Sequence, residues 1–260
     1  MKVLVTSFSL QKNGNEPDEN EDAFYPKRDG ERHGQLFRFA VADGASESML
    51  SGKWADILVT TFSRFKVPSN NFKGFLERAN TNWSSWRKDY LYKRQKWGRP
   101  IQWFEEPGLR AGAYSTFLGL TLIDSEEEKS GKWHAIALGD TCVFQIRNDN
   151  LEAKFPLENS SEFNNRPLLV SSNYPFDERI IESWKERDGG WCVADRFYIM
   201  TDALATWFLE QSESSNVPWR ILCDFGRSER PQSFENWIRE LRVTGQIRND
   251  DITLVRIDLM

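Results

Sequence analysis

The stretch Phe39-Ala40-Val41-Ala42-Asp43-Gly44-Ala45 runs from an apolar segment straight into an aspartate and a glycine. A carboxylate at the end of a strand, next to a residue that lets the backbone approach a ligand closely, suits a site for a hard cation. Asp-Gly is also ordinary turn chemistry, so these residues alone leave both interpretations open. The choice depends on whether other carboxylates of the chain occupy similar settings.

Composition limits the class of protein. The 260 residues are 39% hydrophobic and include 11 Trp and 18 Phe, which is enough for a sizeable core. No clean linker or internal repeat divides the chain, so we expect a single domain over residues 1–260. The net charge of −5 gives no indication of binding to nucleic acid or to acidic membranes.

The expected location is the cytoplasm. No apolar run approaches the length of a membrane span, and the N-terminus turns polar too early for a signal peptide. The three cysteines, Cys142, Cys192 and Cys223, are far apart and form no CxxC pair. This pattern predicts buried thiols in a reducing compartment. We further expect a soluble monomer.

Hydrophobic periodicity predicts the elements of the fold. Strands are predicted at residues 2–10, 35–42, 113–124, 132–147, 195–201 and 252–260. Helices are predicted at residues 51–65, 72–95, 175–188, 203–212, 218–225 and 233–244, with an irregular segment over 148–175. Because strands and helices are grouped and do not alternate, the pattern favours an α+β fold of antiparallel sheets with helices packed outside.

Seven acidic residues stand where apolar strands meet turns: Glu21, Asp22, Asp43, Asp140, Asp202, Asp250 and Asp251. Aspartate is depleted within strands, and converging carboxylates would repel each other unless cations lay between them. An oxygen-only set of ligands, in a chain with two His, selects Mg²⁺ or Mn²⁺ over zinc or copper. The scarcity of His also argues against a Ser-His-Asp triad, and no glycine-rich nucleotide loop is present.

The order of these motifs resembles the PPM/PP2C family of metal-dependent protein serine/threonine phosphatases. The resemblance extends from about residue 5 to 258 and rests on Asn20-Glu21-Asp22, Val41-Ala42-Asp43-Gly44, Leu138-Gly139-Asp140, Met200-Thr201-Asp202-Ala203 and Asn249-Asp250-Asp251-Ile252-Thr253. It implies a four-layer α/β/β/α sandwich, in which two antiparallel β-sheets pack face to face between helices.

The resemblance also implies a role for each carboxylate. Asp43, Asp202 and Asp250 would bind a first metal ion. Glu21, Asp43 and the Gly44 carbonyl would bind a second. Asp140 and Asp202 would form a weaker third site, Asp22 would orient metal-bound waters, and Asp251 would support the cluster. Asp22, Asp43 and Asp202 are therefore the expected catalytic residues, and the cofactors are two Mg²⁺ or Mn²⁺ ions.

The implied reaction is hydrolysis of phosphoserine or phosphothreonine in a protein. A water bridging two divalent ions would attack phosphorus in line, without a covalent phosphoenzyme. The expected partners are a phosphorylated protein substrate and a Ser/Thr kinase. Residues 148–175 occupy the place of the family's variable flap near the active site.

Three departures from the family pattern bear on this expectation. Pro17 stands where the family often carries a phosphate-binding Arg, and we name Lys12 and Arg110 as candidate substitutes. Ala45 replaces a His that some members carry, and Ala203 replaces the usual Gly after Asp202.

These departures leave alternatives open. One is a non-catalytic binding or regulatory module on the same fold. Another is a metal-dependent phosphatase of a small phosphorylated molecule. A third is an α+β domain whose acidic residues only form turns.

Overall fold

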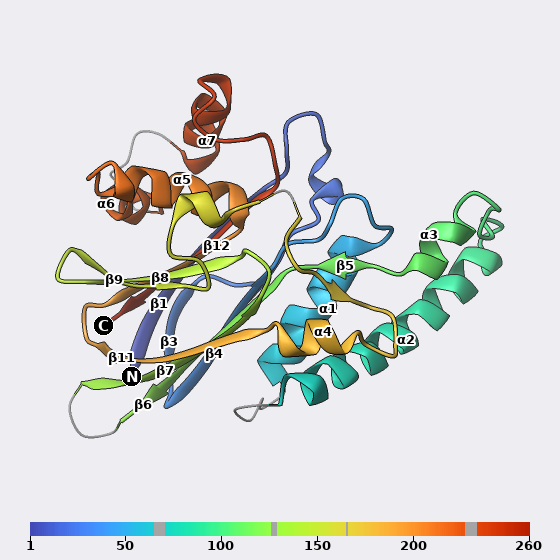
Figure 1. Ribbon diagram of the computed structural model, residues 1–260, viewed down its shortest axis with the longest axis horizontal. Helices are drawn as coiled ribbons and strands as arrows, with labels where there is room; N and C mark the ends of the chain where they lie inside the picture. Colours follow the sequence, from blue (N-terminus) through green and yellow to red (C-terminus); the bar gives the residue numbers. More distant parts are fainter. Residues whose placement is uncertain (65–70, 126–128, 165, 227–232) are drawn as a thin grey trace.

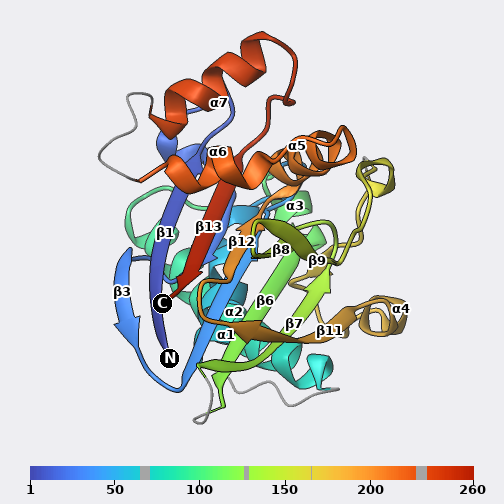
Figure 2. The same ribbon diagram turned by 90° about the vertical axis from the view of Figure 1, so that its left-hand side faces the viewer.

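The computed structural model describes residues 1–64, 71–125, 129–164, 166–226 and 233–260. Its two main sheets are antiparallel (Figures 1 and 2). The six-stranded sheet has the order β3 (Gly30–His33), β1 (Lys2–Leu10), β13 (Ile252–Leu259), β12 (Arg196–Met200), β8 (Cys142–Arg147) and β9 (Asn150–Phe155). The five-stranded sheet has the order β11 (Lys185–Cys192), β7 (Ser130–Leu138), β6 (Phe117–Asp124), β4 (Leu36–Ala42) and β2 (Ala23–Tyr25). A small third sheet pairs β10 (Val170–Ser171) with β5 (Tyr114–Ser115).

Helices cover the outer face of each main sheet. Helices α1 (Ser51–Arg64) and α2 (Phe72–Lys96) pack on the five-stranded sheet, where Phe62 and Phe117 meet edge to face. Helices α5 (Asp202–Glu213), α6 (Pro218–Asp224) and α7 (Phe234–Val243) pack on the six-stranded sheet (Figure 2). Two shorter α-helices of the described residues are α3 (Glu106–Ala111) and α4 (Glu178–Glu182).

A third apolar cluster lies between the two sheets. It joins residues of β1, β12 and β13 with residues of β4, β6 and β7, among them Val5, Ile257, Phe39 and Leu120. Strands buried on one face by helices and on the other by a second sheet are apolar throughout, as Phe39 to Ala42 are. The predicted four-layer α/β/β/α sandwich is confirmed.

Most predicted elements match the structure within a few residues. The predicted strand at 2–10 matches β1, and the predicted strand at 35–42 matches β4 to within one residue. The predicted helix at 233–244 is α7, whose N-cap Ser233 accepts a hydrogen bond from the Asn236 backbone N–H. Its apolar stripe, Trp237, Ile238 and Leu241, is buried as the 3.6-residue period requires.

The prediction of one continuous strand over 132–147 was wrong. The chain breaks at Gly139 and Asp140, so that β7 belongs to one sheet and β8 to the other. Gly139 has a φ of +97°, and a Cβ there would lie 2.8 Å from the Thr116 side chain. Only glycine fits this turn. Asp140 therefore follows apolar residues because it lies at the crossover from one sheet to the other, and not inside a strand.

Two other predictions need correction. Residues 148–175 are not irregular throughout, because β9 and β10 form within them. The predicted helix at 175–188 shrinks to α4, since the residues from Lys185 onward pair with β7 as an edge strand. Here a neighbouring strand with free backbone groups overrode local helical preference.

Of the three thiols, Cys142 and Cys223 are buried as predicted, but Cys192 is exposed. Phe65, residues 126–128 of the predicted hairpin turn and residue 165 of the predicted flap lie outside the described residues. In the ranges that the structure describes, no helix is both long and apolar enough to cross a bilayer.

Candidate metal centre

The predicted acidic residues lie at ends of strands that meet at one edge of the sandwich. Ala23 pairs with Ala42, which places Asp22 and Asp43 just beyond the same end of β2 and β4. Met200 pairs with both Leu254 and Cys142, so Asp202, Asp250 and Asp140 leave the other sheet at its corresponding edge. Carboxylates from five separate stretches of the sequence thus come from two facing sheets.

Backbone contacts hold Asp43 and Gly44 in place. The Asp43 carbonyl accepts hydrogen bonds from the Thr116 N–H (2.8 Å) and the Ser115 hydroxyl (2.8 Å). The Gly44 N–H donates to the Glu21 carbonyl (3.2 Å). A Cβ on Gly44 would lie 2.7 Å from that carbonyl oxygen and 2.8 Å from the Ser51 backbone. Gly44 is therefore required for the close approach of the first two motifs and the start of α1.

Asp251 holds the segment around Glu21 next to the segment that precedes β13. Its carboxylate accepts hydrogen bonds from the Glu21 N–H (2.8 Å) and the Lys12 N–H (2.8 Å). The Glu21 carboxylate in turn accepts a hydrogen bond from the Ser51 hydroxyl and lies 4.0 Å from the Lys12 ammonium. Asp251 thus acts as a support that aligns Glu21, which agrees with the secondary role expected for it.

The electrostatic state of the cluster follows from burial and mutual repulsion. Burial, followed by the charges of Asp22, Asp140, Asp250 and Asp251, holds the pKa of Asp43 well above its ordinary value. Burial, together with the nearby charge of Asp251, raises the pKa of Asp22 from 3.8 to about 8, against a hydrogen bond from the Thr201 hydroxyl (3.1 Å). These carboxylates are costly to ionise together without a cation.

Asp140 and Asp202 have further features that suit a cation site. Burial raises the pKa of Asp140 to about 6. Asp22, Asp140 and Asp202 each keep one buried carboxylate oxygen without a hydrogen-bond partner among the described residues. Buried oxygens normally have a hydrogen-bond partner, so three buried carboxylate oxygens without one fit a site for hard cations. In the described part of the chain, however, no three acidic, His or Cys side chains yet converge as a coordination sphere.

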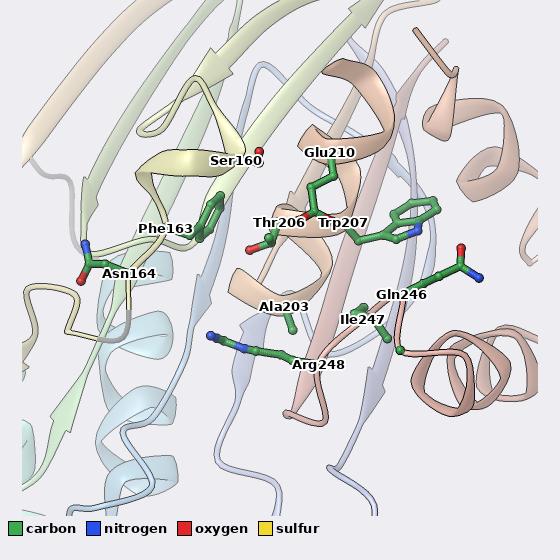
Figure 3. A pocket seen from close by; sticks show the side chains of 11 residues that line it. Ser160, Phe163, Asn164, Ala203, Thr206, Trp207, Glu210, Gln246, Ile247 and Arg248 are labelled. Carbon is green, nitrogen blue, oxygen red and sulfur yellow. The ribbon is translucent and has the colours of Figure 1, made fainter. Parts of the chain in front are cut away.

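Arg248 is one reason why these carboxylates do not form a coordination sphere, because it pairs with two of them. This residue was not identified from the sequence. Its guanidinium forms ion pairs with the carboxylates of Asp202 and Asp250, the latter at 3.3 Å. Figure 3 shows the side chain extending from the loop before β13 past the start of α5. Arg248 lies two residues before Asp250, in a bend where the Asp250 N–H donates to the Arg248 carbonyl (3.1 Å), and this short separation in the sequence was the available signal.

A cavity of about 780 Å³ opens at the cluster. Its lining includes Asp43, Gly44, Asp202, Arg248 and Asp250, together with Asn164 and Arg166 of the predicted flap. Of the predicted phosphate-binding residues, Lys12 reaches this rim, since its ammonium contacts the Ser46 hydroxyl at 2.9 Å. Arg110 is exposed on α3 and is not among the described lining residues, although Gly108 and Ala111 are. Pro17 is exposed in a short 3₁₀ helix.

A helix-flanked double sheet with a carboxylate cluster at one edge defines the PP2C type of fold. The chain belongs to the protein phosphatase 2C family, whose model matches residues 14–241. No curated protein matches the chain by sequence.

Solved structures match the whole chain at low sequence identity. The serine/threonine phosphatase PstP/Ppp of Mycobacterium tuberculosis matches with a TM-score of 0.59 and 12% identity, covering 100% of this chain and 99% of that one. RsbX in complex with magnesium matches with a TM-score of 0.52 and 17% identity, covering 100% and 96%. The catalytic domain of PstP with two manganese ions matches with a TM-score of 0.51 and 12% identity, covering 99% of each. At these identities the likeness establishes the fold.

Proposed function

We propose that the protein is a Mg²⁺- or Mn²⁺-dependent phosphatase that hydrolyses phosphoserine and phosphothreonine in protein substrates. The observation that carries the proposal is that carboxylates of both sheets line one cavity, Asp43 from one sheet and Asp202 and Asp250 from the other. Membership of the phosphatase family and the manganese held by a protein of the same fold support it. We place the activity in the cytoplasm, on substrates supplied by a Ser/Thr kinase.

The residues proposed to hold two divalent ions are Glu21, Asp43, Gly44, Asp202 and Asp250, with Asp140 for a weaker third. Divalent ions held there would lower the pKa of a water nucleophile and neutralise charge on the phosphoryl oxygens. Asp22, at the base of the cluster, would hold a proton or orient water through its free oxygen.

The same cavity offers cationic groups for the substrate phosphate in place of the arginine absent at Pro17. Lys12 reaches the rim of the cavity through its contact with Ser46 and also lies near Glu21. Arg248 lines the cavity, where its guanidinium would be free to donate to phosphate if Asp202 and Asp250 held metal ions.

Removing metal tests the proposal directly. Hydrolysis of a phosphothreonine peptide should require Mg²⁺ or Mn²⁺ and should fall to background in EDTA, then return when metal is restored. Calorimetry should detect Mn²⁺ binding to the same preparation. If the protein neither binds Mn²⁺ nor hydrolyses the peptide or a small phosphoester, the proposed function is wrong.

Arg248→Gln should change metal and substrate binding in opposite directions. Mn²⁺ should bind about tenfold more tightly, because no tethered cation competes for Asp202 and Asp250. At saturating Mn²⁺, KM for the phosphopeptide should rise about tenfold, because a phosphate contact is lost. Arg239→Gln is the matched control, since Arg239 is exposed on α7 and pairs with Glu235. An unchanged Mn²⁺ affinity would contradict the competition.

The ion pairs of Arg248 also favour one alternative, a binding module in which the arginine permanently replaces a metal ion. The two functions predict different calorimetry. In a permanent module, Mn²⁺ would bind only in the Arg248→Gln variant and not in the wild-type protein.

A further inference from the structure

The second half of α2 and the loop that follows project from the body of the protein (Figure 1). We call residues 87–105 the arm. The buried residues of α2 end at Trp83, so the arm lies beyond the contact between the helix and the five-stranded sheet. Four large aromatic side chains of the arm are nevertheless exposed: Tyr92 (66%), Trp97 (68%), Trp103 (81%) and Phe104 (64%). Four such residues within 13 positions are unusual unless another molecule covers them.

The arm holds these aromatics in a defined arrangement. Arg94 binds the Glu105 carboxylate through both terminal nitrogens (2.9 and 3.0 Å) and donates to the Arg99 carbonyl (2.6 Å). Glu105 also accepts a hydrogen bond from the Gln102 N–H (2.8 Å). These contacts fasten the loop to the helix. Binding a partner would therefore cost little ordering entropy in the loop.

The charge of the arm is opposite to that of the chain. It contains six Lys or Arg against two Asp or Glu, in a protein whose net charge is −5. Lys88, Lys93, Lys96 and Arg99 are exposed. Aromatic residues together with Arg are the composition typical of the energetic centres of interfaces, and exposed lysines add attraction for acidic partners.

The arm is continuous with the cavity of the candidate metal centre. Trp103 and Phe104 come just before Glu105, the N-cap of α3, and Gly108 in α3 and Ala111 at its last position line that cavity. Arg87 anchors the connection by donating to the Leu109 carbonyl (3.0 Å). A helix of this length spans roughly 9 Å, which about three residues of extended peptide would cover.

We propose that the arm is a docking surface for an acidic segment of the phosphoprotein substrate, one that carries apolar side chains and lies within a few residues of the phosphorylated site. This inference rests on the proposed phosphatase function, because it takes the phosphate to occupy the cavity. It adds a determinant of substrate choice outside the metal centre.

The test uses fluorescein-labelled phosphothreonine peptides with one short neutral core. One peptide has the core alone, a second adds alternating Glu and Leu on both sides, and a third has Lys in place of Glu. Hydrolysis is measured with Mn²⁺, and binding is measured by fluorescence anisotropy in EDTA. The variants are Trp103→Ser with Phe104→Ser, and Lys93→Glu with Lys96→Glu. Val243→Ser, which alters an equally exposed apolar residue on α7, is the control.

For the wild-type protein and the control, the Glu/Leu extension should lower KM about tenfold, and the Lys/Leu extension should not. Both double variants should lose this advantage and keep kcat on the core peptide. Equal KM for core and Glu/Leu peptides would overturn the proposal, as would an advantage that survives both double variants.

Two further outcomes separate this proposal from others. If the wild-type protein hydrolyses no peptide, the proposed phosphatase function is wrong. Anisotropy then still tests the docking surface: preferential binding of the Glu/Leu peptide through the arm supports the docking proposal, and the absence of this preference overturns the docking proposal. Basic and aromatic residues also suit binding to an anionic membrane surface, which vesicles containing about one third phosphatidylserine test. Binding to vesicles through the arm, with no preference for the Glu/Leu peptide, would overturn the proposal.

Discussion

Asp43→Asn is expected to reduce metal-dependent phosphopeptide hydrolysis by about a thousandfold or more, because it removes the carboxylate proposed to bridge two ions. The same variant should unfold at a higher temperature than the wild-type protein in EDTA, by the equivalent of about 1–2 kcal/mol. The second effect follows from the cluster itself. Burial and four neighbouring carboxylates make ionised Asp43 costly in the folded protein, and a neutral amide of the same shape removes that cost.

The backbone contacts of Asp43 do not depend on its carboxylate, so the fold should be retained. The measurements are initial rates with saturating Mn²⁺ and thermal unfolding in EDTA. Asp89→Asn, at an exposed position of α2, is the control and should leave both unchanged. A variant that loses activity but is also less stable in EDTA would contradict the account of the cluster as a set of repelling charges.

Without metal, stability should rise as the pH is lowered from about 8 to about 5. The pKa of Asp22 is about 8 in the folded protein and 3.8 in its ordinary state. Between these values the folded state binds the proton and the unfolded state does not, so the free energy of unfolding falls as pH rises. Asp140, whose pKa is raised to about 6, acts in the same direction.

Urea unfolding in a chelator should show a gain of about 2–4 kcal/mol between pH 8 and pH 5, since one pKa unit corresponds to about 1.4 kcal/mol and partial solvent access reduces the effect. Asp22→Asn should reduce this slope by the contribution of Asp22 and leave the contributions of Asp43 and Asp140. With saturating Mn²⁺ the slope should reverse, because metal binding needs ionised carboxylates. A slope in Asp22→Asn equal to that of the wild-type protein would exclude Asp22 as its source.

Much of the fold could be predicted because local and global signals agree in it. The apolar segment before Asp43 is buried on both faces, and the stripe of α7 is buried on one, so periodicity alone identified both. The edge strand β11 could not be recognised in this way. Its residues from Lys185 to Asp188 are charged, and their strand conformation comes from pairing with β7.

The acidic residues of the candidate site were predictable as a set because aspartate next to apolar strands needs a reason. Their division into ligands of particular ions stays a prediction. Arg248 escaped notice because a single arginine in a polar loop has no periodic signature. Its meaning depends on Asp202, 46 positions away in the sequence, reaching the same place in space. The exposed arm escaped notice for a different reason: Trp97, Trp103 and Phe104 lie beyond the end of α2, where helical periodicity does not distinguish buried from exposed residues.

The placement of acidic residues on both sheets has a mechanical consequence. Asp43 extends from the five-stranded sheet, whereas Asp202 and Asp250 extend from the six-stranded one. The apolar layer draws the two sheets together along their length, while like charges push them apart at one rim. Repulsion between these carboxylates therefore favours separation of the two sheets at that rim. A cation bound there would replace the repulsion with attraction and hold the two sheets together.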